Sequence, residues 1–219
     1  MDDIFRDVSI ASKKSADYFF PNESIIVELK TLNENHNSKE RILKLVDDEL
    51  ARKKYRPQLR DEWLNGRAKL PKCVARKVND RIQNSLKNLV RKANEQIVST
   101  RSLIGARHDA ILIVANLNEF LFGPIELLRN LSGHALKRSS PAIDAILLIT
   151  PGVTYSAGGG TPQHYIAPAF AEGKEYLADF VEPFAESWIE FESQSLGLRS
   201  EVEKVFDFDE ASLTARPVI

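Results

Sequence analysis

Residues 110–115, Ala-Ile-Leu-Ile-Val-Ala, form a short and uninterrupted apolar run that decides the class of fold. Such a run is typical of a strand that is buried on both faces of a sheet. The sequence predicts a helix from about Pro124 to Leu136, which begins with proline as helices allow. A second apolar strand is expected from Ile143 to Ile149. This strand–helix–strand order predicts a parallel pair of strands with helices covering the sheet.

A hairpin is predicted upstream of this unit. Residues 15–20 are rich in aromatics, and residues 24–32 are β-branched and alternate from Val27 onward. The intervening Pro21-Asn22-Glu23-Ser24 has the composition of a turn. Together with the parallel unit, the hairpin indicates an α/β fold, with α+β as the alternative. In either class the centre is a mixed sheet flanked by helices.

The remaining segments are mostly helical by pattern. We expect a helix at 39–54 with Ser38 as its N-cap, followed by an irregular or short-helical stretch at 55–72. A long helix is expected at 73–103, where Gly105 stops it. A loop at 153–168 contains Gly158-Gly159-Gly160, and an acidic helix follows at 172–192. The predicted organisation is a core at 1–150 with a basic helical insertion at about 51–107. A C-terminal loop and acidic helical extension follow at 151–219.

Composition excludes several classes of protein. The chain has 219 residues and a single cysteine, Cys73, so it has no disulfide framework and no cysteine-rich zinc site. Apolar runs fall short of the roughly 20 residues that span a bilayer. The acidic N-terminus lacks the basic start and apolar stretch of a signal peptide. These features predict a cytoplasmic protein without a membrane partner.

Charge is distributed unevenly along the chain. Residues 51–107 hold 16 Lys and Arg against 4 Asp and Glu, a balance of +12, whereas residues 170–210 hold 3 against 12, a balance of −9. A basic stretch of this size in a nearly neutral protein is a candidate polyanion-binding surface. The alternative is a long helix with a solvated basic face that packs against the acidic segment.

The register of the hairpin brings two carboxylates together. If residues 22–23 form a two-residue loop, Phe20 faces Ile25, and counting outward places Asp17 opposite Glu28. Directly opposed residues share a face of the sheet, with Cβ atoms about 4.5–5.5 Å apart. The other face carries the residues expected to enter the core: Tyr18, Phe20, Ile25, Val27 and Leu29.

These carboxylates suggest metal chemistry. Asp17 and Glu28 repel each other, and a protonated carboxyl, a nearby cation or a bound divalent metal would each offset the repulsion. Carboxylate oxygens suit Mg²⁺ (or Mn²⁺), which keeps several waters and can also take a substrate phosphate. Lys30 shares the face of Glu28 and could orient or activate a water. These groups can hydrolyse a phosphodiester. The alternative is that Glu28 and Lys30 are surface residues of an edge strand.

The motif resembles the PD-(D/E)XK nuclease superfamily, which has the restriction-endonuclease-like fold. The resemblance lies in Ala16-Asp17 followed by Ile26-Val27-Glu28-Leu29-Lys30-Thr31. It implies that Asp17, Glu28 and the Leu29 carbonyl bind the metal and that Lys30 is catalytic. It also implies a polar residue on the packing helix, for which Gln96 and Lys92 are candidates.

Two features depart from the family pattern. The usual proline before the aspartate is Ala16, and few residues precede Asp17, so the upstream acidic helix of many members is short or absent. Asp7 is a candidate for an additional ligand, with a surface role as the alternative. His36, just after the motif strand, is a further candidate for approach to the site.

The long helix supplies candidate phosphate contacts. They are Arg76, Lys77, Arg81, Lys87, Arg91 and Lys92. The leading hypothesis is a Mg²⁺-dependent nuclease acting on DNA. The alternatives are a catalytically inactive nuclease-fold module that binds nucleic acid or protein, and a homo-oligomeric assembly subunit in which the acidic helix docks on a neighbour's basic region.

Overall fold

The computed structural model describes residues 15–32, 39–104, 108–116, 124–136, 142–153 and 163–196. At its centre is a five-stranded sheet with the strand order β1-β2-β3-β4-β5. The strands are β1 (Tyr18–Phe20), β2 (Ile25–Leu32), β3 (Asp109–Asn116), β4 (Ala145–Val153) and β5 (Gln163–Phe170). The three central strands are parallel, and each edge strand is antiparallel to its neighbour. The predicted mixed sheet and the predicted parallel strand–helix–strand unit are therefore confirmed.

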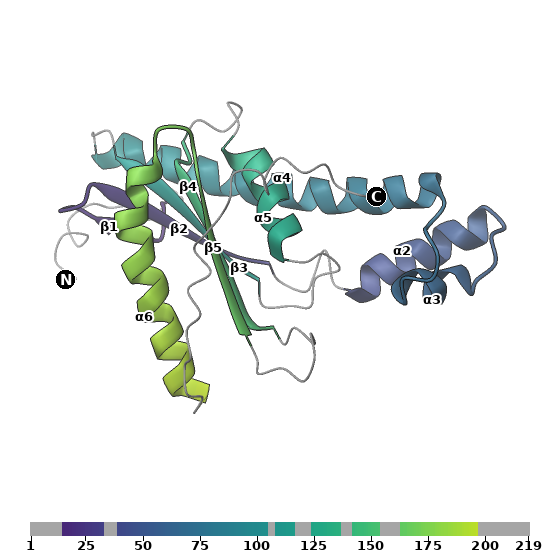
Figure 1. The fold of residues 1–219 in the computed structure, drawn as a ribbon. Coiled ribbons are helices and arrows are strands. Elements are labelled where there is room, and N and C mark those ends of the chain that lie inside the picture. Colours follow the sequence, from purple (N-terminus) through teal and green to yellow (C-terminus); the bar gives the residue numbers. More distant parts are fainter. Residues whose placement is uncertain are drawn as a thin grey trace.

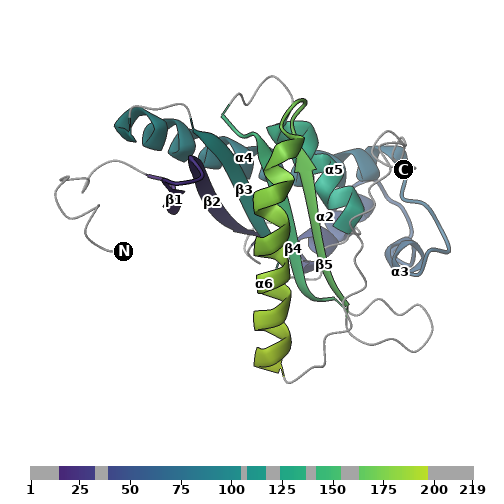
Figure 2. The same ribbon diagram turned by 60° about the vertical axis from the view of Figure 1, so that its left-hand side comes forward.

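Helices cover both faces of this sheet. They are α2 (Lys39–Arg52), α3 (Leu59–Leu64), α4 (Lys72–Ile104), α5 (Pro124–Ala135) and α6 (Ala178–Leu196), the last preceded by a 3-10 turn, η1 (Glu175–Leu177). Helices α4 and α5 lie on one side of the sheet, and α6 crosses the other side (Figures 1 and 2). The first half of α4 extends past the sheet, where α2 and α3 pack beside it.

Strand alternation divides the buried residues into two cores. On one face, Ile26, Leu112 and Ile146 belong to a cluster with the buried side of α4. On the opposite face, their chain neighbours join a cluster with α6, made of Ile25, Val27, Ile111, Ile113, Ala145, Leu147, Ile149, Ile166, Leu177, Val181 and Ala185. Because successive side chains of a strand point to opposite faces, β2 contributes to both layers. Glu28 therefore points toward α4, on the same side as Ile26.

Helix α4 is the longest element, with 33 residues. Its buried side chains recur every three or four residues from Val74 to Thr100, as one face of a helix requires. At 1.5 Å per residue the helix is about 50 Å long. It therefore links the helices beyond the sheet to the strand that carries Glu28.

The structure corrects three expectations. Residues 163–168 are not loop but the greater part of β5, and β4 continues through Thr150 to Val153. Pro168 and mixed polarity hide β5 in the sequence, yet an edge strand tolerates proline because one side of its backbone needs no partner. Tyr18, Leu29 and Phe20 do not enter the core, since they are 55%, 37% and 36% exposed.

Other expectations concern residues outside the described ranges. Ser38, Gly105 and the run Gly158-Gly159-Gly160 are among them. Among the helices that the structure does describe, none has the length and apolar character needed to cross a membrane.

Candidate active site

The hairpin has the predicted register. Tyr18 pairs with Val27, Phe19 with Ile26 and Phe20 with Ile25. Its turn is closed by the Ser24 amide, which donates to the Pro21 carbonyl over 3.3 Å. One step beyond the paired residues, Asp17 Oδ2 accepts a hydrogen bond of 2.8 Å from the Leu29 amide. Asp17 thus lies at the edge of the hairpin beside the backbone of residues 28–29, as the count outward from the turn predicts.

Glu28 is the buried centre of this site. Its side chain has no exposed surface. One oxygen, Oε1, pairs with the ammonium of Lys30, and the Asp17 amide lies near enough to the carboxyl to lower its pKa. The other oxygen, Oε2, is buried and accepts no hydrogen bond from any residue that the structure describes. A buried carboxylate oxygen normally has a partner, because leaving it without one costs free energy. The unpaired oxygen is therefore an open acceptor position within the site.

Helix α4 holds Lys30 in place from the opposite side. The Lys30 ammonium donates to Gln96 Oε1 over 2.7 Å, and Gln96 Nε2 donates to the Ser15 carbonyl over 3.1 Å. One turn along the helix, Thr100 Oγ1 accepts a hydrogen bond of 2.6 Å from the Ala16 amide. Gln96 and Thr100 thus fix both Lys30 and the chain immediately before Asp17.

Of the two helix residues considered as site neighbours, the structure brings only Gln96 to the site. Lys92 is exposed and makes no ion pair within the described ranges. Thr100 was not among the expected site residues. Its position one turn after Gln96 on a buried helix face was the available sequence signal, since residues four apart are neighbours on a helix.

The electrostatics of Glu28 reflect its burial. Desolvation is the largest influence and raises the pKa of this carboxyl above its usual value. The hydrogen bond and charge of Lys30 oppose that shift, while the nearby charge of Asp17 adds to it. The expected repulsion between the two carboxylates is therefore present, and Lys30 offsets part of it.

The donor set fits a hard divalent cation. Asp17 is exposed, Glu28 offers an unpartnered oxygen, and Leu29 adjoins both through its bond to Asp17. Mg²⁺ is commonly held by one or two carboxylates and keeps several waters. No group of three or more His, Cys, Asp or Glu residues arranged to hold a metal occurs in the described part of the chain. Asp7 and His36 lie outside that part.

The six basic residues predicted to contact phosphates are all exposed along α4. Half of them are already paired: Arg76 with Asp80 at 3.9 Å, Lys77 with Glu49 at 2.6 Å, and Arg91 with Glu95. The other three, Arg81, Lys87 and Lys92, have no ion pair to any described residue. Available positive charge along the middle of α4 is therefore smaller than the sequence count indicates.

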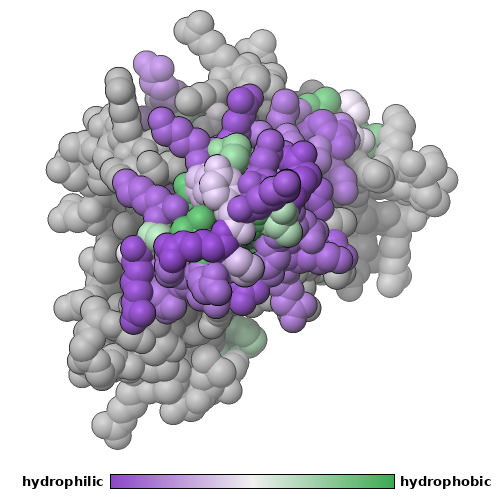
Figure 3. All heavy atoms as spheres, turned by 90° about the vertical axis from the view of Figure 1, so that its right-hand side faces the viewer, coloured by the Kyte–Doolittle hydropathy of each residue, from purple (hydrophilic) through white to green (hydrophobic). Residues whose placement is uncertain are grey.

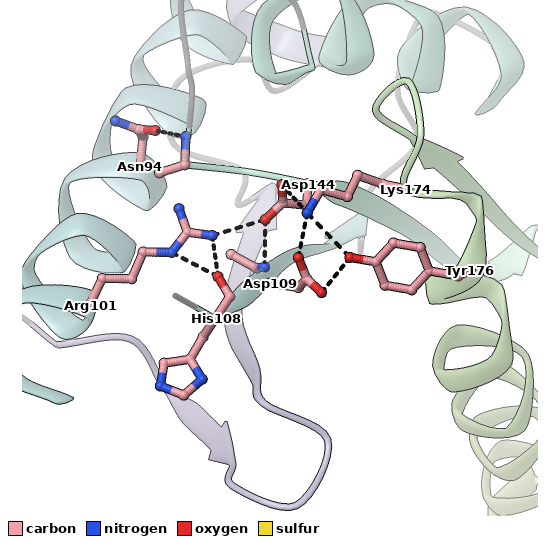
Figure 4. A network of polar contacts seen from close by, with 9 residues as sticks. Asn94, Arg101, His108, Asp109, Asp144, Lys174 and Tyr176 are labelled. Carbon is pink, nitrogen blue, oxygen red and sulfur yellow. Dashed lines mark hydrogen bonds and ion pairs between the residues drawn. The ribbon is translucent and has the colours of Figure 1, made fainter. Parts of the chain in front are cut away.

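A second polar cluster lies where β3 and β4 begin (Figure 4). Arg101 bonds Asp144 over 2.9 Å, and Lys174 bonds Asp109 over 2.6 Å and approaches Asp144 at 3.5 Å. Tyr176 donates to the other oxygen of Asp109 over 2.6 Å. Its two cations balance its two carboxylates, so the cluster joins α4, two strand starts and the segment after β5 without leaving a free charge.

Comparisons with known proteins do not assign the chain to a family. No family model, curated protein or solved structure matches the chain. We therefore interpret the site from the residues that form it.

Proposed function

We propose that this protein is a Mg²⁺- or Mn²⁺-dependent nuclease that hydrolyses phosphodiester bonds in DNA, on a restriction-endonuclease-like version of the α/β fold. The observation that carries the proposal is the unpartnered, fully buried oxygen of Glu28 beside Asp17 and Lys30. A buried carboxylate left open in this way is costly unless it receives a ligand. The motif resemblance and the basic helix both agree with a phosphate-bearing substrate.

Each residue has a separate role in the proposed reaction. Asp17, Glu28 and the Leu29 carbonyl would hold the cation, which when bound stabilises negative charge on the phosphate. Lys30 places a positive group next to Glu28, where it orients the attacking water or stabilises the charge that develops on the phosphate. Gln96 is a positioning residue, because it touches the Lys30 ammonium and not the proposed substrate.

The proposal is tested by cleavage of plasmid and oligonucleotide DNA with Mg²⁺ or Mn²⁺. We expect Asp17→Asn, Glu28→Gln and Lys30→Met each to lower the rate by about 10²-fold or more, as the loss of one charge-stabilising group typically does. Glu23→Gln is the matched control, since Glu23 is an exposed carboxylate in the turn of the same hairpin. Wild-type cleavage that survives all three site substitutions would refute the site assignment.

Gln96→Leu separates positioning from catalysis. Loss of the bond to Lys30 leaves the ammonium less well placed, so we expect a lower kcat with little change in KM. Gln96→Glu restores an acceptor for Lys30 and should recover part of kcat. If both variants instead raise KM and leave kcat unchanged, Gln96 does not act through Lys30.

A second candidate function is a nuclease-fold module that binds nucleic acid without cutting it. The pairing of Lys30 with Glu28 favours this alternative, because it already neutralises part of the buried charge. Such a module would bind DNA equally well with and without divalent ions and would cut under neither condition. Cleavage assays and binding assays on the same preparation therefore separate the two functions.

A further inference from the structure

The helices beyond the sheet form a distinct basic surface. We define the helical tip as residues 50–77, which comprise the end of α2, all of α3 and the start of α4. Leu50 and Val74 belong to the same buried cluster, and Lys77 bonds Glu49 over 2.6 Å, so the two long helices are joined at this point. The tip lies at the end of α4 that is remote from α6 and β1 (Figure 1).

Both acids of the tip, Asp61 and Glu62, are in ion pairs, as are Asp47 and Glu49 just before it. Glu49 pairs with Arg52 and Lys77, Glu62 pairs with Arg56, and Arg60 pairs with both Asp47 and Asp61. Five further cations are exposed and have no ion pair anywhere in the described ranges: Lys53, Lys54, Arg67, Lys69 and Lys72. Among the described residues, more unpaired cations therefore lie at the tip than along the middle of α4, where Arg81, Lys87 and Lys92 are the unpaired ones.

The five unpaired cations lie in or next to the connections between helices. Lys54, two residues after the end of α2, has the left-handed conformation, with φ +57°, which glycine adopts more easily than lysine. Lys53 and Lys54 lie in the α2–α3 connection, and the other three lie in or just after the α3–α4 connection. Seen from this end of the molecule, the surface is largely hydrophilic around a small apolar area (Figure 3).

The chemistry of the tip fits a phosphate backbone better than a protein partner. Four of the five unpaired cations are lysines, which are depleted in the cores of protein–protein interfaces. Lysine and arginine dominate contacts with nucleic-acid phosphates. Tyr55, which is 41% exposed, adds a phenol that can also bond a phosphate oxygen.

The length of α4 sets the distance between the tip and the candidate active site. Gln96, which touches Lys30, lies 24 residues after Lys72 on one continuous helix. This separation is roughly 36 Å at 1.5 Å per residue. One turn of B-form duplex covers roughly 34–36 Å. A duplex lying along α4 would therefore present the same side of its backbone to the site and to the tip.

We infer that the helical tip binds the phosphate backbone of a double-stranded nucleic acid about one helical turn away from the bond held at Asp17, Glu28 and Lys30. The inference rests on the proposed function for the position of that bond. Binding by the tip itself does not depend on cleavage. The tip sets how the duplex lies on the protein, and the site performs the chemistry.

Cys73 allows the distance to be measured directly. It is the single cysteine of the chain, it is exposed, and it follows Lys72. An iron–EDTA reagent is coupled to Cys73 of the full chain, which is then bound to a duplex of about 30 base pairs. The reagent should cut the duplex roughly 10 base pairs away from the position at which the protein itself cuts in Mn²⁺. Cys73→Ser treated with the same reagent is the control. Reagent cuts that coincide with the protein's own cut, or no reagent cuts at all, would overturn the inference.

Salt dependence tests the cations themselves. The triple variant Lys53→Gln/Lys69→Gln/Lys72→Gln is compared with Lys53→Arg/Lys69→Arg/Lys72→Arg, which keeps the charge. With EDTA present, the slope of log K against log salt should be less negative by about 2.7 in the neutral variant than in wild type. The loss of affinity of the neutral variant between about 50 and 200 mM salt should therefore be roughly 40-fold smaller than that of wild type. The arginine variant should keep the wild-type slope.

The outcomes separate the inference from the proposed function. A protein that never cuts DNA but shows the slope change and the Cys73-directed cuts retains the tip as a binding surface and loses only the nuclease proposal. A protein that cuts DNA with an unchanged slope in the neutral variant loses the tip and retains the nuclease proposal. If the neutral variant instead abolishes a salt-sensitive self-association without affecting DNA binding, the tip docks an acidic surface such as α6, and the inference is wrong.

Discussion

Glu28 combines complete burial with negative charge, and its neighbours determine whether that charge is tolerated. Lys30 and Glu28 lie two residues apart on one strand, so they share a face and can pair without any tertiary help. Removing one partner of a buried pair typically costs about 3–5 kcal/mol because the other charge is left uncompensated. Variants of the candidate site therefore need a folding measurement beside every activity measurement.

Asp109 offers a pH test at the residue scale. Burial alone would raise its pKa, but the hydrogen bonds from Lys174 and Tyr176 outweigh burial and hold the pKa below the ordinary value of 3.8. The ionised carboxylate therefore stabilises the fold above pH 3.8, and this contribution is lost as the pH falls through the lowered pKa. We expect Asp109→Asn to lower the free energy of unfolding by about 1–3 kcal/mol near neutral pH.

The measurement is urea unfolding of wild type and Asp109→Asn across the acidic range. The difference between the two proteins should narrow as the pH drops below 3.8. Tyr176→Phe is the control, since it removes one bond to Asp109 and leaves the Lys174 ion pair in place. A difference that stays constant with pH would show that the loss comes from packing and not from the ionised carboxylate.

At the scale of single elements, α4 has two uses. Its second half covers β2 and places Gln96 and Thr100 at the site, while its first residues help to build the helical tip. Its buried side chains recur from Val74 to Thr100, so one continuous helix carries both parts. The distance from the site to the tip is therefore a property of one element.

Helix α6 contains Pro183 within its length, at an exposed position. Proline has no amide hydrogen to donate, and its ring conflicts with the carbonyl one turn earlier. We expect Pro183→Ala to raise the free energy of unfolding by about 1–2 kcal/mol, which is less than the roughly 3 kcal/mol difference in intrinsic propensity because the helix already accommodates the ring. Chemical denaturation monitored by circular dichroism measures the change.

Glu182→Ala is the matched control for Pro183→Ala. Glu182 is the preceding residue on α6 and is exposed, so its replacement should change stability by no more than about 0.5 kcal/mol. A Pro183→Ala variant that is no more stable than wild type would indicate that the ring makes packing contacts that offset its cost to the helix.

Across the whole molecule, opposite charges occupy different regions. Unpaired cations gather at the helical tip, whereas the described part of α6 carries acidic side chains and no basic ones. Separation of charge on one molecule gives it an oriented field that guides a charged partner during encounter. The sheet lies between these two regions (Figure 1).

Metal binding should appear in the stability of the whole molecule. A ligand that binds only the folded state stabilises it, by about 2.7 kcal/mol at a hundredfold excess over the dissociation constant. We expect saturating Mn²⁺ to raise the Tm of wild type and of the turn variant Glu23→Gln. Glu28→Gln should lose most of the shift. An equal Mn²⁺-dependent shift in Glu28→Gln would place the ion elsewhere on the protein.

Much of the fold can be predicted from local sequence patterns. The apolar run at 110–115 is followed by a helix and then by a second apolar strand. This strand–helix–strand order predicts a parallel pair of strands whose connecting helix covers the sheet. The turn after Phe20 sets the register of the hairpin, since each residue counted outward has one partner. Asp17 beside the backbone at Glu28 follows from that count alone.

Tertiary structure decided the remaining features, because each depends on residues that are distant in the chain. Strand β5 forms by pairing with β4, although Pro168 conceals it locally. The rotation of α4 selects Gln96 over Lys92, and in the described part of the chain the burial that it completes leaves Glu28 Oε2 without a hydrogen-bond partner. Ion pairs formed across elements cancel part of the basic stretch and leave five of its unpaired cations at the helical tip. Local sequence specifies backbone direction and side-chain face, whereas long-range packing determines which charges are buried, paired or free.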